Sequence, residues 1–159
     1  MMRIVSVLLT GMVFGAAIQS GPVPRGRIVA LNHVGLNVEH FDDALNFYTK
    51  TLGFQQVYSR NGPDGKQVSA FLQISRNSFI EITQVSANQA AGVTHFGVQV
   101  DDMDLALAQF KKNGINVGDV RKGSTATKVG SATDPWGVRL ELLETGPESL
   151  QGKAMESWR

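Results

Sequence analysis

The segment VTHFGVQVD at residues 93–101 repeats a pattern that first occurs as LNHVGLNVE at residues 31–39. Each copy has a His followed by one residue and a Gly, with aliphatic residues at alternate positions. The two histidines, His33 and His95, are 62 residues apart (95 − 33). Alternation with a period of two is typical of a β-strand that buries one face. The repeat therefore predicts two copies of one structural module, each with a His at the same place in its first strand.

Each copy leads into a predicted amphipathic helix. Apolar residues recur at helical spacing over residues 41–52 and again over residues 103–113. Gly53 and Gly114 follow directly, and glycine at this place favours the end of a helix. The apolar side of each helix fits the aliphatic face of the strand before it.

Three further strands are predicted after each helix, at residues 54–60, 67–74 and 79–85 in the first half and at 115–120, 125–132 and 138–143 in the second. The order is therefore β-α-β-β-β twice, with module one at residues 28–85 and module two at residues 93–145. One helix for four strands means that a single module cannot close its own sheet, so we expect the two modules to pair. The sequence predicts an α+β fold in which two tandem βαβββ modules form a cupped mixed sheet with the helices outside.

The composition excludes some classes of partner. The 159 residues carry a formal net charge of +1, and 18% of them are charged. This balance provides no basic surface for nucleic acid, which is therefore not expected as a partner. The absence of cysteine excludes disulfides and thiolate metal ligands.

The first twenty residues have the pattern of a secretory signal peptide. A short positive start at Arg3 precedes a nearly continuous apolar run over residues 4–17, which ends in small residues. That run of 14 residues (4 to 17) is short for a membrane span, which needs about 20. Residues 1–20 therefore predict an exported protein, periplasmic or secreted, that keeps no membrane anchor after cleavage. An uncleaved anchor helix and a wrongly assigned start codon are the alternatives.

Two glutamates match the two histidines. Glu81 lies between aliphatic residues in the last strand of the first module, and Glu141 lies likewise in the second. The distance from His to Glu along the chain is 48 residues in the first module (81 − 33) and 46 in the second (141 − 95). Two imidazoles and two carboxylates at equivalent places predict a site for a divalent metal such as Zn, Ni, Co, Mn or Fe.

The chain resembles the vicinal oxygen chelate superfamily, which includes glyoxalase I, methylmalonyl-CoA epimerase, extradiol dioxygenases and the fosfomycin and bleomycin resistance proteins. The resemblance covers residues 28–145. The segments that carry it are HVG at 33–35, FYTKTLGF at 47–54, FIEI at 79–82, HFGVQVDD at 95–102 and DPWGVRLEL at 134–142.

The set of two His and two Glu is most similar to that of bacterial glyoxalase I. This resemblance implies that His33, Glu81, His95 and Glu141 bind the metal, and that Glu141, or else Glu81, is also the catalytic base. It implies a lyase or isomerase that removes a proton beside a carbonyl group while the metal stabilises the enediolate. At the position where glyoxalase I of this type has an arginine that binds the glutathione carboxylate, this chain has Asn37.

Other readings of the sequence remain open. A resistance-type protein that binds a small molecule without turnover, and an Fe(II) extradiol-type dioxygenase, are the alternatives to the lyase or isomerase. The resemblance allows the four ligands to come from one chain or from two chains of a homodimer. Arg60, Arg121 and Lys128 either reach the cup and hold an anionic substrate or are solvated charges at strand ends. The tail at residues 146–159 either packs over a module or a second subunit or is disordered.

Overall fold

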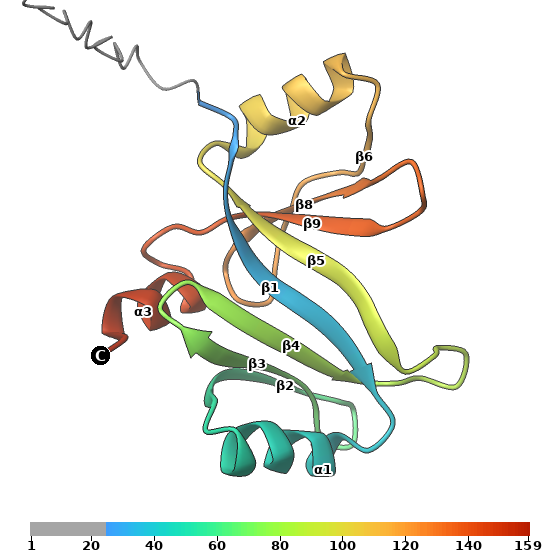
Figure 1. Ribbon diagram of the computed structural model, residues 1–159, viewed down its shortest axis with the longest axis vertical. Coiled ribbons are helices and arrows are strands. Elements are labelled where there is room, and N and C mark those ends of the chain that lie inside the picture. Colours follow the sequence, from blue (N-terminus) through green and yellow to red (C-terminus); the bar gives the residue numbers. More distant parts are fainter. Residues whose placement is uncertain (1–24) are drawn as a thin grey trace, which may run out of the picture.

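The computed structural model describes residues 25–159, and the predicted signal peptide lies outside this part of the chain. The elements of the first half are β1 (Ile28–Val38), α1 (Phe41–Asn46), the π-helical turn η1 (Phe47–Thr51), β2 (Gln55–Asn61), β3 (Gln67–Ser75) and β4 (Ser78–Gln84). Those of the second half are β5 (Gly92–Val100), α2 (Met103–Lys112), β6 (Asn116–Val117), β7 (Arg121–Lys122), β8 (Lys128–Thr133), β9 (Arg139–Glu144) and α3 (Leu150–Ser157) (Figure 1). No helix within residues 25–159 is both long enough and apolar enough to cross a bilayer.

The predicted order of elements is confirmed, with two local differences. The helix expected at residues 41–52 widens after Asn46 into the π-helical turn η1, in which the amide of Leu52 donates to the carbonyl of Phe47. The strand expected at residues 115–120 is wrong in extent. This part of the chain forms two short strands, β6 and β7, which both pair with β8 and are separated by residues 118–120.

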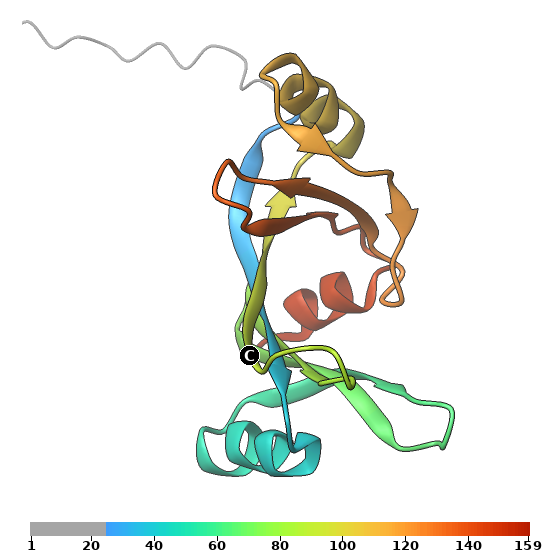
Figure 2. The same cartoon turned by 90° about the vertical axis from the view of Figure 1, so that its right-hand side faces the viewer.

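All the strands belong to one mixed sheet with the order β2-β3-β4-β1-β5-β9-β8-β6, and β7 also pairs with β8. Within each module the first and last strands are parallel neighbours, β1 beside β4 and β5 beside β9. The modules meet where β1 and β5 pair antiparallel. The predicted α+β fold with a cupped mixed sheet is confirmed, and in Figure 2 both ends of the sheet curl towards the same side.

The register between β1 and β5 places equivalent residues of the two modules opposite each other. His33 pairs with Gly97, and Gly35 pairs with His95. One extra residue of β1, Asn32, is accommodated between the pairs Leu31–Val98 and His33–Gly97. A bulge of this kind breaks the alternation of faces, and both Asn32 and His33 are therefore buried.

Each module has its own hydrophobic core beneath its helix. In module one Ile82 and Leu72 pack with Phe41 at the start of α1, and in module two Leu142 and Val98 pack with Met103 of α2 and its neighbours. The helices α1 and α2 lie outside the curved sheet at its two ends (Figure 2). The last strand of each module thus contributes aliphatic residues to the core on one face and leaves its glutamate on the other.

The start of each helix is fixed by the last residue of the last strand in its own module. The side chain of Gln84 accepts a hydrogen bond from the amide of Phe41 at 3.0 Å. Glu144 accepts one in the same way from the amide of Met103 at 2.7 Å. These bonds satisfy amides at the helix N-terminus that have no partner inside the helix. The two modules, which repeat one sequence pattern, therefore also repeat this contact at the start of the helix.

The C-terminal tail forms α3, which lies on the concave side of the sheet (Figure 2). Ala154 packs against Phe71 and Phe79 of module one. The amide of Leu150, at the start of the helix, donates to the carbonyl of Thr125 in module two at 2.9 Å. The tail therefore packs within its own chain and bridges the two modules inside the cup.

Candidate metal centre

The four residues predicted to bind a metal converge at the centre of the concave face. His33, Glu81, His95 and Glu141 each offer one ligand atom, and these atoms lie within 4.8 Å of one another. They come from β1, β4, β5 and β9, which are four successive strands of the sheet. One chain supplies all four side chains, two from each module, so the cluster needs no second subunit. That they bind a metal, and that the glutamates are catalytic, stays a prediction.

The distances between the four side chains are those of a compact polar cluster. The two Nε2 atoms of His33 and His95 are 3.0 Å apart. Oε2 of Glu81 lies 3.8 Å from the first and 3.5 Å from the second. Oε2 of Glu141 lies 3.7 Å from both. Ligand atoms around one zinc-like ion, each about 2.1 Å from it, span about 4 Å, so the spacing fits a single ion.

Hydrogen bonds on the far side of each imidazole determine which ring nitrogen carries the proton. The hydroxyl of Thr94 donates to the carbonyl of Gly35 at 3.1 Å, so it accepts a proton from Nδ1 of His95 at 2.9 Å. The amide oxygen of Asn32 can only accept, and it lies 3.0 Å from Nδ1 of His33. In the neutral form, each ring therefore carries its proton on Nδ1.

This proton arrangement leaves two unprotonated Nε2 atoms facing each other beside two carboxylates. Neither nitrogen can donate to the other, so the close approach is repulsive without a cation. Metal-binding histidines commonly donate their second N–H to a carbonyl, carboxylate or other acceptor, as these two do. The donor set, two imidazole nitrogens and two carboxylate oxygens, therefore fits a divalent ion of the zinc, nickel or iron type.

The protonation states at neutral pH also suit a metal. Burial lowers the pKa of His33 to about 4, although the neighbouring carboxylates oppose the shift. Burial would raise the pKa of Glu81, but the neighbouring His95, His33 and Arg139 lower it overall. A neutral imidazole and an ionised carboxylate are the forms that bind metals.

Glu141 differs from Glu81 in its contacts. Its Oε1 accepts a hydrogen bond from Arg139 at 2.5 Å and lies 3.4 Å from a guanidinium nitrogen of Arg121. Its Oε2 is the oxygen that points to the two histidines. The carboxylate of Glu141 thus contacts the arginines with one oxygen and the histidines with the other. Glu81 is more exposed, and its close contacts are with the histidines.

The charged residues considered from the sequence have separate positions. Arg121 reaches the cluster through Glu141. Lys128 instead contacts Asp104 and Glu144 at the start of α2, and these contacts raise its pKa. Arg60 lies exposed on β2.

The glycines of the repeated pattern make room for the imidazoles. A Cβ atom on Gly35 would collide with the ring of His95, and a Cβ on Gly97 would collide with the ring of His33. The register of β1 against β5 is the cause, because it places each His directly opposite the other module's Gly. The ring of Phe71 packs edge-on against His33 with centroids 5.3 Å apart. Each ring is therefore held by both modules.

Two hollows flank the cluster. The larger, about 230 Å³, includes Glu81, His95, Glu141 and Arg139 in its lining. The smaller, about 70 Å³, lies between Phe71 and the turn at 123–125, and Arg121 is part of its wall. A substrate can therefore approach Glu81, His95 and Glu141 from the larger hollow.

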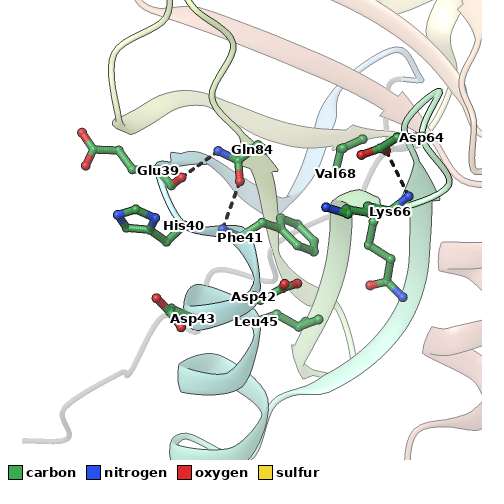
Figure 3. A pocket seen from close by; sticks show the side chains of 11 residues that line it. Glu39, His40, Phe41, Asp42, Asp43, Leu45, Asp64, Lys66, Val68 and Gln84 are labelled. Carbon is green, nitrogen blue, oxygen red and sulfur yellow. Dashed lines mark hydrogen bonds between the residues drawn. The ribbon is translucent and has the colours of Figure 1, made fainter.

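A more voluminous hollow, about 820 Å³, lies elsewhere, between the start of α1 and the β2–β3 turn (Figure 3). Its polar groups are engaged locally. Gln84 bonds the backbone of Glu39 and Phe41, and Asp64 bonds the amide of Lys66. Because these groups fix the turns rather than converge on one point, we place the chemistry at the smaller hollows beside the His/Glu cluster.

Comparison with known proteins identifies the family. The model of the Glyoxalase/Bleomycin resistance protein/Dioxygenase superfamily matches residues 30–142. The chain belongs to this superfamily. The resemblance noted in the sequence is thereby confirmed. The matched range includes all four clustered residues, which lie on β1, β4, β5 and β9.

Relatives in the glyoxalase superfamily include proteins named as lyases. The probable chloroplastic lactoylglutathione lyase of Arabidopsis thaliana is 32% identical over 126 residues, which cover 72% of this chain and 35% of that protein. The lactoylglutathione lyase of Escherichia coli O157:H7 is 29% identical over 127 residues, which cover 72% of this chain and 91% of that protein. The chain spans less than half the length of the plant relatives it matches.

Solved structures of the glyoxalase superfamily share the fold. Methylmalonyl-CoA epimerase from Mycobacterium tuberculosis superimposes with a TM-score of 0.67 at 21% identity, over 81% of this chain and 95% of that one. A variant of the Streptomyces coelicolor methylmalonyl-CoA epimerase, in complex with 2-nitronate-propionyl-CoA, gives a TM-score of 0.65 at 21% identity, over 76% of this chain and 99% of that one. At this identity the likeness concerns the fold.

Sequence reasoning missed several residues that contact the cluster. Arg139 lies two positions before Glu141 on the same strand and so shares its face, which is a signal that was available. Thr94 directly precedes His95, and Asn32 directly precedes His33, but strand alternation assigns such neighbours to the opposite face. Gln151 of the tail donates to the Oδ1 atom of Asn32 at 3.3 Å, and no pattern in the sequence links it to this site.

Replacing either glycine of the pattern is expected to weaken metal binding. Gly35→Ala and Gly97→Ala each place a methyl group where the imidazole of the other module lies, and we expect a loss in metal affinity of about 10- to 100-fold, as for changes around metal ligands. Chelator competition measures the affinity. Gly146→Ala is the control, because nothing lies within 4 Å of its added carbon. Unchanged affinity in both variants would contradict the assigned role of these glycines.

Acid is expected to destabilise the metal-free protein in a defined range. Because folding lowers the pKa of His33 from 6.5 to about 4, the unfolded chain binds more protons between these values, and stability falls as the pH falls. The loss between pH 7 and pH 5 is about 2 kcal/mol, measured by urea unfolding. His33→Gln should lack this loss, whereas His40→Gln, which changes an exposed His, should keep it. A wild-type stability that is equal at both pH values would refute the prediction.

Proposed function

We propose that the protein is a divalent-metal-dependent lyase or isomerase of the glyoxalase type that removes a proton beside the carbonyl group of a small substrate. The observation that carries this proposal is the convergence, within one chain, of two imidazoles with free Nε2 atoms and two carboxylates. The names of the relatives, lactoylglutathione lyases, support the same reaction type. The hollow beside the cluster supplies space for a substrate.

The two histidines and two glutamates would hold the ion. A divalent ion bound there supplies Lewis acidity, which makes a C–H bond beside a carbonyl group easier to ionise. The bonds of His33 to Asn32 and of His95 to Thr94 keep both rings in the tautomer that presents Nε2. Phe71 restricts the ring of His33 from the side.

Glu141 is the proposed base, and Glu81 is the alternative. A base needs a carboxylate oxygen that is held in a fixed direction towards the reacting atoms. The guanidinium groups of Arg139 and Arg121 hold Oε1 of Glu141, and this leaves Oε2 directed at the cluster. Oε2 would take the proton and return it to the neighbouring carbon. Glu81, on the opposite strand pair, is less constrained and could take the same role for a substrate bound in the reverse orientation.

Replacing the proposed base Glu141 is expected to lower the rate of proton exchange strongly and to affect metal binding less. In Glu141→Gln the amide oxygen remains available to the ion but cannot accept the proton, so we expect solvent-deuterium exchange beside the carbonyl group of small α-hydroxyketones and α-hydroxy acids to fall about 10²- to 10⁴-fold at saturating metal. Exchange is followed by proton NMR, with metal content measured on the same samples. Glu148→Gln, at a side chain that is 90% exposed, is the matched control.

The outcomes separate the candidate functions. Near one equivalent of metal per chain in the wild type, lost in His95→Ala, together with exchange that depends on Glu141, is the expected result. No uptake of zinc, nickel, cobalt, manganese or iron would contradict the proposal and leave a small-molecule-binding protein of the resistance type. Oxygen consumption by the iron-loaded protein would instead point to a ring-cleaving dioxygenase.

We also infer that the protein is exported. The support is the sequence pattern of residues 1–20, a positive start, an apolar run and small residues. We expect the protein produced from the full sequence in a bacterial host to lack this segment, with a new N-terminus near residue 21, as measured by intact mass and N-terminal sequencing. Recovery of the full-length chain from the cytosol would contradict export.

A further inference from the structure

We propose that the substrate of this site is a small anion, a carbonyl compound whose carboxylate or phosphate group is held by Arg121 and Arg139. The inference rests on the proposed function, since it concerns the same site, but it is carried by separate observations. These are the balance of charge around the cluster, the position of the two arginines at its two hollows, and the size of those hollows.

The charges around the cluster do not cancel once a divalent ion is bound. The charged side chains that line the two hollows, in the part of the chain described, are Glu81, Glu141, Arg121 and Arg139, and His95 also lines the larger one. Two carboxylates balance a divalent ion, and both histidines present unprotonated Nε2 atoms as ligands. The two guanidinium groups then leave the site with a positive charge of about two. A substrate with one or two negative charges complements this charge.

The arginines are placed to contact a ligand as well as Glu141. Arg139 on β9 lines the larger hollow, and Arg121 on β7 lines the smaller one. Their side chains are 46% and 60% exposed, so both guanidinium groups remain accessible from the cup. A guanidinium group offers five N–H donors in one plane, and the bond to Oε1 of Glu141 uses few of them. The remaining donors suit a carboxylate or phosphate group.

Other basic groups near the rim are compensated. Lys128 contacts Asp104 and Glu144, and its side chain belongs to the α2 end of module two rather than to the hollows. The rest of the larger hollow is mainly polar, with the side chains of Asn37, Thr83, Gln89 and Thr94 and one aliphatic residue, Leu36. Such a lining suits a hydrogen-bonding substrate more than an apolar one.

The size of the larger hollow suits a reacting group of a few carbons. The larger hollow of about 230 Å³ has room for roughly eight water molecules at about 30 Å³ each, and drug-sized pockets start at about 300 Å³. The other end of the cup is closed by α3, whose first amide bonds Thr125, and by the packing of Ala154 on Phe71. A larger carrier group would therefore extend into solvent.

Three probes that share one reactive group test the inference. Hydroxyacetone, hydroxypyruvate and dihydroxyacetone phosphate all contain a CH₂OH group beside a carbonyl, with the same two oxygens for a metal and the same C–H bond. They differ only in the third substituent, which is a methyl, a carboxylate or a phosphate-bearing group. Titration calorimetry on the metal-loaded full chain measures affinity, and solvent-deuterium exchange measures reaction. The two anionic probes distinguish a carboxylate from a phosphate substrate.

We expect at least one anionic probe to bind more than 10-fold tighter than hydroxyacetone at low salt, with the difference shrinking as salt is added. Arg121→Gln should reduce this preference about 5- to 10-fold, as expected for the loss of one nearby charge, because it weakens the binding of the anionic probes more than that of hydroxyacetone. The matched control is Lys122→Gln, which removes the same charge from the neighbouring exposed residue on β7, a residue that lines neither hollow.

The results distinguish failure of this inference from failure of the proposed function. Equal affinity for all three probes, or equal effects of Arg121→Gln and Lys122→Gln, would overturn the anionic substrate. If hydroxyacetone exchanges as fast as the anionic probes and binds as tightly, the anionic substrate is overturned. The same result supports the lyase or isomerase. An anion preference that depends on Arg121, without exchange in any probe, would support the anion site and contradict the proposed reaction.

Discussion

The antiparallel pairing of β1 with β5 is the constraint on which the rest of the structure depends. Its register sets His33 against Gly97 and Gly35 against His95, so each imidazole occupies space that the other module leaves free. The parallel pairings of β1 with β4 and of β5 with β9 then bring Glu81 and Glu141 to the same face. A slip of one residue at the seam would turn these side chains to the opposite faces. The cluster is thus a property of the interface between modules, and neither module contains it alone.

Much of this arrangement could be predicted from the sequence because it is repeated. The period of two in both His segments and the equivalent positions of Glu81 and Glu141 predict the strands, their order and the four clustered residues. What escaped prediction depends on local departures from period two or on long-range packing. The bulge at Asn32 brings to the concave face a residue that alternation would place on the face covered by the helix. The strand after α2 is shortened, and the partners of Arg121 and Gln151 follow from tertiary packing that no local pattern records.

The polar groups behind His33 fix the position of its ring, and one of them lowers the stability of the folded protein. The oxygen of Asn32 accepts from His33 and from Gln151 of α3, and Gln151 in turn accepts from Thr127 in the loop before β8. The amide nitrogen of Asn32 is the one buried side-chain atom of this kind without a partner in residues 25–159, which costs about 1–3 kcal/mol. The result is an imidazole whose proton and orientation are set by three separate segments. Both modules and the C-terminal helix therefore contribute to one ring.

The bridging position of α3 also has a consequence for the order of events during synthesis. Gln151 bonds Asn32, a residue 119 positions earlier in the chain, and its other partner lies in the second module. These contacts can form only after residue 151 has left the ribosome. Until then Asn32 lacks its hydrogen bond from Gln151, although β1 and β5 have already been made. The hydrogen bonds behind His33 can therefore be completed only after the strands that carry both histidines are available to pair.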